Sequence, residues 1–311
     1  MSVEPTVTVA IPVLNEEAHI DACLAAVAAQ TYLGIVEVLV VDGGSTDATP
    51  AMVADRPGVR LLENPLRIQA AALNIALGEA KGDVFVRVDG HCVIAPDYVA
   101  KCVEALQRTG AAMVGGAMTP VAEGRLQRGI AAAMASKLGA GPARFHSGGA
   151  SGPVDTVYLG AYRTERAREV GGYAEDVGVN EDAEFAIRMG ARGPVWFDPA
   201  IRSTYVPRSS VKAVSRQFYR YGRSRASTVR RHPRSLTGRQ LAAPLLVLGL
   251  LSPARKVVAG GYLALVAAGC VKEASKDRAA GAAMAAVIPT MHLSWGVGFL
   301  RGLVLPHRRR G

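Results

Sequence analysis

The chain has 311 residues, of which 50% are hydrophobic and only 5% aromatic, and a formal net charge of +10 at pH 7. Its length allows one large domain with an appendage and a sizeable core. The charge is local: residues 201–239 hold 11 Lys/Arg and no acid, whereas residues 1–200 hold 16 Lys/Arg against 24 Asp/Glu. A basic segment directly before an apolar one favours a juxtamembrane stretch facing anionic lipid, and it argues against nucleic-acid binding by the whole surface.

Short apolar runs alternate with helix-like segments through the first hundred residues. The predicted strands are Val7–Ile11, Val36–Val41, Val59–Leu62 and Val84–Val88. The predicted helices are Glu17–Gln30, Gln69–Ala80 and Asp97–Gln107. Because the strands are apolar on both faces, the alternation predicts an α/β fold with a mostly parallel sheet covered by helices on both sides.

Residues 119–156 break this rhythm. They are rich in Gly, Ala and Ser, which predicts a mobile or substrate-covering insertion. Regular structure is expected to resume at Val157–Tyr162, followed by a helix at Glu181–Met189 and an edge strand at Ile201–Val206.

The chain becomes strongly apolar after Arg239. Leu241–Val271 contains two prolines and divides into pieces that are each too short for a straight span of about 20 residues. A broken span, an interfacial hairpin and two short helices remain open for it. Ala279–Leu305 is long enough to cross a bilayer, and the basic tail 306–310 is expected on the cytoplasmic side. A soluble helical subdomain is the alternative.

These patterns predict a catalytic domain at 1–206, a basic interfacial helix segment at 207–239 and membrane-associated helices at 240–311. The N-terminus lacks a basic stretch followed by an apolar one, so the catalytic part is expected to stay in the cytoplasm. The four cysteines show no metal-ligand spacing and are expected to be reduced thiols.

Polar clusters follow three of the predicted strands. Asn15-Glu16 follows the first strand, Asp42 the second and Asp89 the fourth. In parallel sheets, ligands bind beyond the carboxyl ends of the strands. Asp42, which is followed by two glycines, can accept hydrogen bonds from a base or a ribose. The plainer alternative is a Gly-rich turn with Thr46 or Asp47 as a helix N-cap.

Asp89-Gly90-His91 can direct one carboxylate and one imidazole at a single divalent cation. An oxygen and nitrogen ligand pair suits Mn²⁺ more than Mg²⁺. Arg87 lies two residues before Asp89, on the same face of the strand, and can pair with it.

Two further clusters carry candidate chemistry. Glu181 and Asp182 open a predicted helix, where one carboxylate can act as a general base. The alternative is a set of N-terminal helix acids, with Glu184 and Arg188 as a surface pair. In the basic segment, Gln217, Arg220 and Tyr221 share one helix face, as phosphate and sugar ligands would; a basic interfacial helix without a specific ligand is the alternative.

The order of these motifs resembles the family 2 inverting glycosyltransferases with the Rossmann-like GT-A fold. The resemblance runs from Thr8 to about Tyr221 and rests on Pro12-Val13-Leu14-Asn15-Glu16, the Asp42–Asp47 loop, Asp89-Gly90-His91, Asn180-Glu181-Asp182 and Gln217-x-x-Arg220-Tyr221. Within the family the chain is most similar to the succinoglycan-type bacterial exopolysaccharide glucosyltransferases. Two positions depart from the usual pattern: His91 replaces the second acid of the metal motif, and Tyr221 replaces a tryptophan.

The resemblance implies a UDP-sugar donor, a polyprenyl-linked saccharide acceptor, anionic membrane lipid as a partner and no nucleic acid. It also implies an inner-membrane enzyme with a cytoplasmic catalytic domain. The implied general base is Asp182, and the implied metal ligands are Asp89 and His91. The implied nucleotide-sugar residues are Pro12, Asn15, Glu16, Asp42, Gly43, Ser45, Arg67, Asp89 and Gly90. The implied diphosphate or acceptor residues are Glu181, Gln217, Arg220 and Tyr221. A polyprenyl-phosphate sugar synthase and a non-catalytic membrane scaffold are the alternatives.

Overall fold

The computed structural model describes residues 4–139 and 143–305, and the predicted cytoplasmic tail 306–310 lies outside them. The described residues form two compact units. The first comprises those of Met1–Thr119, Arg144–Glu175 and Glu181–Val206, and the second those of Pro120–Ala143, Asp176–Asn180 and Pro207–Gly311.

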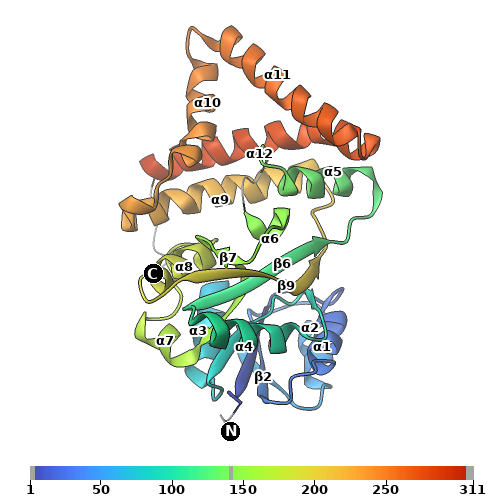
Figure 1. Cartoon of the computed structure of the whole chain (residues 1–311), viewed down its shortest axis with the longest axis vertical. Coiled ribbons are helices and arrows are strands. Elements are labelled where there is room, and N and C mark those ends of the chain that lie inside the picture. The colour runs from blue at the N-terminus through green and yellow to red at the C-terminus, as the bar shows by residue number, and fades with distance from the viewer. Residues whose placement is uncertain (1–3, 140–142, 306–311) are drawn as a thin grey trace. The chain divides into compact units, whose positions relative to one another are not determined.

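The first unit contains a nine-stranded sheet (Figure 1). Its strands are β1 (Val7–Val13), β2 (Ile35–Asp42), β3 (Val59–Glu63), β4 (Val84–Arg87), β5 (Val93–Ile94), β6 (Met113–Pro120), β7 (Gly152–Pro153), β8 (Tyr158–Arg163) and β9 (Val195–Tyr205). They are ordered β3-β2-β1-β4-β8-β6-β9-β5, and β7 pairs with β9. Pairing is parallel among β1 to β4 and antiparallel between β8 and both β4 and β6, and between β9 and both β5 and β7. The α/β class is therefore confirmed, with a larger antiparallel share than the sequence predicted.

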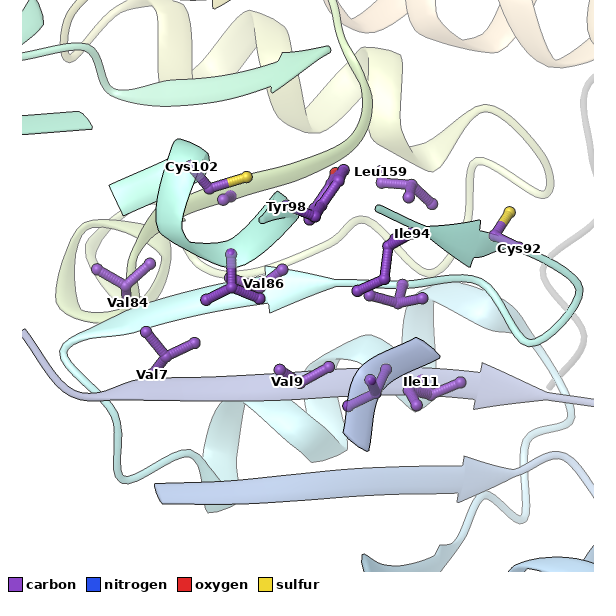
Figure 2. Close-up of a cluster of buried hydrophobic side chains, with 14 of the residues drawn as sticks. Val7, Val9, Ile11, Val84, Val86, Cys92, Ile94, Tyr98, Cys102 and Leu159 are labelled. Atoms are coloured by element: carbon purple, nitrogen blue, oxygen red, sulfur yellow. The ribbon is translucent and has the colours of Figure 1, made fainter. Parts of the chain in front are cut away.

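Helices cover both faces of this sheet, as predicted. They are α1 (Ile20–Ala28), α2 (Thr49–Ala54), α3 (Gln69–Glu79), α4 (Tyr98–Thr109), α6 (Arg144–Ser147), α7 (Thr164–Glu169) and α8 (Glu181–Gly190). Alternate strand residues point to opposite faces. Figure 2 shows Val7, Val9 and Ile11 of β1 on one face, in the cluster that α4 closes with Tyr98. The other face packs against α3, α7 and α8 around residues such as Phe85.

Three predictions about the elements are wrong in part. Residues 119–156 contain helix α5 (Gly124–Ala135), because an Ala-rich run favours helix despite its low complexity. Strand β9 lies between β6 and β5 and is not an edge strand. In Leu241–Val271 the second apolar piece is longer than predicted: α11 (Arg255–Ala274) has 20 residues, since the basic pair Arg255-Lys256 opens this helix and does not interrupt it.

The second unit is helical. Besides α5 and α11 it contains α9 (Val211–Arg231), η1 (Pro233–Ser235), η2 (Gly238–Leu241), α10 (Ala242–Leu251) and α12 (Arg278–Val304). Its core joins α5, α9, α11 and α12 around residues such as Ile130, Phe218, Val266 and Met291. By length and composition, α11 and α12 could each cross a membrane, although 39% of the α12 window is buried inside the protein against 11% for α11.

Helices α9 and α12 run side by side (Figure 1). Ser215 contacts Ser294, and Arg230 reaches the carbonyl of Gly302, so the two helices are parallel. A side chain at Gly298 would collide with the α9 backbone at Tyr219, so glycine permits this close approach.

Candidate functional site

The carboxyl ends of β1, β2 and β4 lie at one edge of the sheet. Val13 pairs with Asp42, and Ala10 pairs with Arg87, in parallel register. The loops after these strands therefore leave the sheet together, which brings the three predicted polar clusters to the same edge.

The loops after β1 and β2 are bound to each other. The backbone N–H of Asn15 donates to Ser45 Oγ at 2.8 Å, and Asn15 Oδ1 accepts from the backbone N–H of Thr46 at 2.8 Å. Asn15 has a φ of +55°, a left-handed conformation that asparagine tolerates better than most residues. The backbone N–H of Glu16 donates to Thr49 Oγ1 at 2.8 Å. Pro12 is buried in β1 just before this loop. The sequence pattern therefore located a real junction of two loops.

Asp42 organises its own loop. Its carboxylate accepts from the N–H groups of Gly44 and Ser45, each at 3.0 Å, and from Ser45 Oγ at 2.5 Å. The N–H of Gly43 donates to the carbonyl of Val13 at 2.9 Å. The turn role is thus present at Asp42 as well as at Asp47, which accepts from Thr49 N; contact of Asp42 with a nucleoside stays a prediction.

Arg67 lies directly over Gly44. A Cβ added at Gly44 would stand 3.0 Å from Arg67 Nε, and Gly44 itself has a φ of +79°. Glycine is therefore required there both by the backbone conformation and by the guanidinium above it. The arrangement brings a cation to the nucleotide loop.

Asp89 is buried and is held by two side chains. Arg87 donates to it from Nε at 2.8 Å and from Nη2 at 3.3 Å, and Gln69 donates from Nε2 at 3.2 Å. The pairing of Arg87 with Asp89 is confirmed. Desolvation opposes the charged form of Asp89, but Arg87 outweighs it and lowers the pKa of the carboxyl group. Asp89 is therefore an anion.

His91 points to the loop after β1. Its Nδ1 lies 2.9 Å from Glu16 Oε1, and its side chain is 41% exposed. Gly90 lies between them under tight packing, because an added Cβ would stand 2.8 Å from Val13 Cγ1 and 3.3 Å from Glu16 Cγ. The residues of the predicted metal motif are thus packed directly against the opening motif.

A divalent cation fits this donor set. Ligand atoms of Asp89, His91 and Cys92 all lie within 4.8 Å of one another. Cys92 Sγ is 2.5 Å from the hydroxyl of Tyr158, and burial raises the pKa of the Cys92 thiol. Cys92 is therefore a hydrogen-bonded thiol, and the carboxylate of Asp89 and the imidazole of His91 are the groups of this set that could hold a divalent cation.

Glu181 and Asp182 stand in the first turn of α8. Arg87 donates from Nη1 to Glu181 Oε1 at 3.1 Å, so one guanidinium binds both Glu181 and Asp89. Desolvation raises the pKa of Glu181 to about 7 against the lowering effect of Arg87, and it raises the pKa of Asp182 as well. An acid pair with raised pKa values at a sheet edge is a candidate for proton transfer.

The structure corrects the reading of Glu184 and Arg188. They do form an i,i+4 pair, with Arg188 Nη2 2.6 Å from Glu184 Oε2. Glu184 is fully buried, however, so the pair is not a surface pair. Arg188 also donates to the carbonyl of Val170 at 2.6 Å, which anchors α8 to the preceding loop.

The remaining predicted residues belong to the second unit. Gln217 donates from Nε2 to the Tyr221 hydroxyl at 2.9 Å, which confirms that they share one face of α9. Arg220 on the same helix is exposed.

Sequence reasoning missed two contributors to the site. Gln69 reaches Asp89 from the start of α3, and Tyr158 reaches Cys92 from β8. No local pattern distinguishes either residue. Only the pairing of β8 with β4 could have placed Tyr158 near the segment after β4 that carries Asp89.

Proteins of known sequence resemble this chain over much of its length. A family model described as glycosyl transferase family 2 matches residues 8–171. The chain is 34% identical to the succinoglycan biosynthesis protein ExoA of Rhizobium meliloti (strain 1021), over 97% of this chain and 96% of the relative. It is also 28% identical to a Methanococcus voltae dolichyl N-acetyl-alpha-D-glucosaminyl phosphate 3-beta-D-2,3-diacetamido-2,3-dideoxy-beta-D-glucuronosyltransferase, over 72% of this chain and 74% of the relative.

Solved structures agree in fold. The mannosyltransferase PcManGT from Pyrobaculum calidifontis, in complex with GDP-Man and Mn²⁺, superposes with a TM-score of 0.65 at 22% identity, covering 97% of this chain and 88% of that one. S. aureus TarS 1–349 in complex with UDP gives a TM-score of 0.53 at 15% identity, covering 93% and 90%. These likenesses establish a GT-A-like fold. The family match and the near full-length relative show that the chain belongs to glycosyltransferase family 2.

Proposed function

We propose that this glycosyltransferase is a metal-dependent, inverting hexosyltransferase. It moves a sugar, expected to be glucose, from a UDP-sugar to a hydroxyl of a membrane lipid-linked saccharide in exopolysaccharide or cell-surface synthesis. The observation that carries the proposal is the buried connection Asp89–Arg87–Glu181, which joins the predicted metal motif to the predicted base segment. The role of the ExoA relative in succinoglycan biosynthesis supports the choice of product.

One set of residues is proposed to bind the nucleotide and the metal, and a different residue is proposed to accept the proton. The Asn15–Ser45 junction and the Asp42 loop are proposed to hold the nucleoside, with Arg67 beside its phosphates. Asp89 and His91 would hold Mn²⁺, which supplies positive charge for the donor diphosphate. Solved relatives bound to GDP-Man with Mn²⁺ and to UDP support a nucleotide-sugar donor.

Asp182 is proposed to be the general base. Its raised pKa makes its carboxylate a stronger proton acceptor than an ordinary aspartate. It takes the proton of the acceptor hydroxyl as that oxygen attacks the anomeric carbon, and the bond from this carbon to the UDP oxygen breaks. A single displacement of this kind inverts the configuration at the anomeric carbon.

The second unit is proposed to hold the enzyme at the cytoplasmic face of the inner membrane. Helix α11 buries little of its apolar surface, and exposed leucines line α10. Helix α12 instead packs along α9, whose exposed face carries Lys212, Arg216 and Arg220. A crossing by α12 would draw these charges toward hydrocarbon at high cost. We therefore place α10 and α11 in the lipid and α12 at its surface.

Asp182→Asn tests the proposed base. This variant should lose transfer from UDP-sugar to lipid-linked acceptor while retaining UDP binding, because asparagine keeps the shape but accepts no proton. Asp55→Asn is the matched control, since Asp55 is exposed at the end of α2 and should retain full activity. Retained transfer to a hydroxyl acceptor by Asp182→Asn would overturn the assignment. Turnover retained with polyprenyl phosphate alone would favour a polyprenyl-phosphate sugar synthase, whose phosphate nucleophile needs no strong base.

A further inference from the structure

A hollow of about 430 Å³ lies between α9 and α12, within the second unit. Helix α9 lines it with two cationic side chains, Lys212 and Arg216, and with hydroxyl groups. Helix α12 lines it with Leu293, Val297 and one further hydroxyl. One wall is therefore positive and hydrogen-bonding, and the other is mainly apolar.

The two cationic side chains of the hollow, Lys212 and Arg216, do not stabilise the fold through ion pairs within the described residues. Lys212 and Arg216 are four residues apart, hence on one face of α9, and both are exposed. Within the described part of the chain neither forms an ion pair. Further along the same helix the basic residues are used structurally, since Arg231 pairs with Asp176 and Arg225 binds Gln240. The charge at the start of α9 is thus available to a ligand.

The hydroxyl groups and the helix end favour an anion at the same place. Ser215 Oγ and Ser294 Oγ are 2.9 Å apart. One donates to the other, so the accepting hydroxyl keeps its own proton for a ligand oxygen. Lys212 and Ser215 stand in the first turns of a 21-residue helix, where the macrodipole is positive.

The apolar wall indicates what the anion is attached to. Leu293 and Val297 lie four residues apart on α12, and Val297 is 44% exposed. Between them, Gly296 meets the backbone of α10 at Ala243. Several leucines of α10 are exposed, with Leu248 at 51% and Leu251 at 79%. Apolar surface therefore continues from the hollow onto α10, as a ligand with a hydrocarbon tail would require.

We propose that this hollow binds the phosphate headgroup of a membrane lipid, with Lys212, Arg216 and the Ser215–Ser294 pair on the phosphate and Leu293 and Val297 on the first carbons of the chain. The proposal rests on the membrane-bound function proposed above. The shared chemistry is a lipid phosphate, which either a bulk phosphodiester lipid or a polyprenyl phosphate can provide. A free inorganic phosphate leaves the apolar wall unused.

The test is lipid binding by the full chain in a neutral detergent. The probes are phosphatidylglycerol, polyprenyl phosphate, phosphatidylcholine and inorganic phosphate. Lys212→Gln/Arg216→Gln should weaken binding of at least one anionic lipid by roughly tenfold or more, because two charge-assisted contacts are lost. Whichever anionic lipid shows this loss identifies the source. Ser215→Ala/Ser294→Ala should weaken it in the same direction without a change of charge.

Arg234→Gln/Arg239→Gln is the matched control, because it removes two exposed charges of the same basic segment outside the hollow. Equal losses of lipid affinity in both double variants would mean that only the net charge of the basic segment matters. That result would overturn the proposal of a specific site in the hollow. Binding of inorganic phosphate as tight as that of the lipids would overturn it too. UDP binding with Mn²⁺ is measured on the same samples. Its absence from the wild type would count against the proposed function, whereas the hollow is judged by the lipids alone.

Discussion

Arg87 Nη1 lies 3.1 Å from Glu181 Oε1, and both side chains are buried. The same guanidinium holds Asp89 through Nε at 2.8 Å. One cation at the end of β4 thus binds the metal-motif acid and an acid at the start of α8, which lie far apart in the chain. Because the anions outnumber the cation, the site is pre-arranged to accept further positive charge or a proton.

Replacing Arg87 should lower the free energy of unfolding. Arg87→Met would leave Asp89 and Glu181 buried without their cation, and loss of one partner from a buried ion pair costs about 3–5 kcal/mol. Arg87→Lys should cost less, since it keeps the charge but cannot donate in two directions from a planar fork. Denaturant unfolding of both variants measures the free-energy change. As a control, Arg56→Met removes a 39% exposed arginine paired with the exposed Asp21 and should cost less than about 1 kcal/mol; equal losses would contradict a special role for Arg87.

Gly90→Ala should damage the site through packing. The added Cβ would stand 2.8 Å from Val13 Cγ1 and 3.3 Å from Glu16 Cγ, so Glu16 must shift and carry its contact with His91 along. Overpacking of this kind costs about 1–3 kcal/mol. Gly78→Ala is the control, because nothing lies within 4 Å of its Cβ position in α3 and alanine favours helix. Thermal unfolding compares the two. A Gly90→Ala variant as stable as Gly78→Ala, with unchanged metal affinity, would contradict the packing argument.

The polar clusters at the carboxyl ends of the strands could be predicted because each is marked by a pattern of neighbouring residues in the sequence. Three of the four apolar runs end in a polar cluster, and parallel pairing of β1 with β2 and β4 brings those ends together. The pairing of Arg87 with Asp89 also followed from strand periodicity alone.

Contacts between distant segments could not be predicted in this way. Nothing near Gln69 marks it as a donor to Asp89, and the burial of Glu184 depends on packing of α8 against the sheet. Strand β6, in the antiparallel part of the sheet, could not be predicted for a related reason. Strand β6 contains Gly115 and Gly116, which lower its strand propensity, and both are needed because added side chains would collide with Val157 and Ile201.

His91 should determine the choice of metal. His91→Ala should weaken Mn²⁺ binding in the presence of UDP by roughly tenfold or more, because the nitrogen ligand is lost. His91→Asp should restore binding but reduce the preference for Mn²⁺ over Mg²⁺, since carboxylate oxygen suits both ions. Calorimetric titration with each ion measures this. His19→Ala, at an exposed position, should change nothing. An unchanged Mn²⁺ affinity in His91→Ala would remove this residue from the ligand set.

The raised pKa values of Glu181 and Asp182 predict how activity depends on pH. A general base must be deprotonated, so transfer should increase as pH rises through the raised range of the pair, well above the usual range of a carboxyl group. Asp182 raises the pKa of Glu181, and the coupling is reciprocal, so Glu181→Gln removes a charge that opposes ionisation of Asp182. The variant's activity profile should therefore shift to lower pH. An initial-rate profile at saturating donor measures the shift, and a profile that moves to higher pH would contradict the coupling.

The free energy of unfolding should also depend on the ionisation of Glu181. Unlike the transfer rate, it should decrease as pH rises. Burial raises the pKa of Glu181 from its usual 4.5 to about 7, so the folded state holds this proton more tightly than the unfolded chain. The contribution of Glu181 to stability is then fully present below pH 4.5 and is lost as pH rises through 7. In Glu181→Gln that loss is absent. The stability of the variant relative to wild type should therefore increase by about 2–4 kcal/mol between these limits and level off above them. A pH-independent difference in unfolding free energy would mean that folding does not raise the pKa of Glu181.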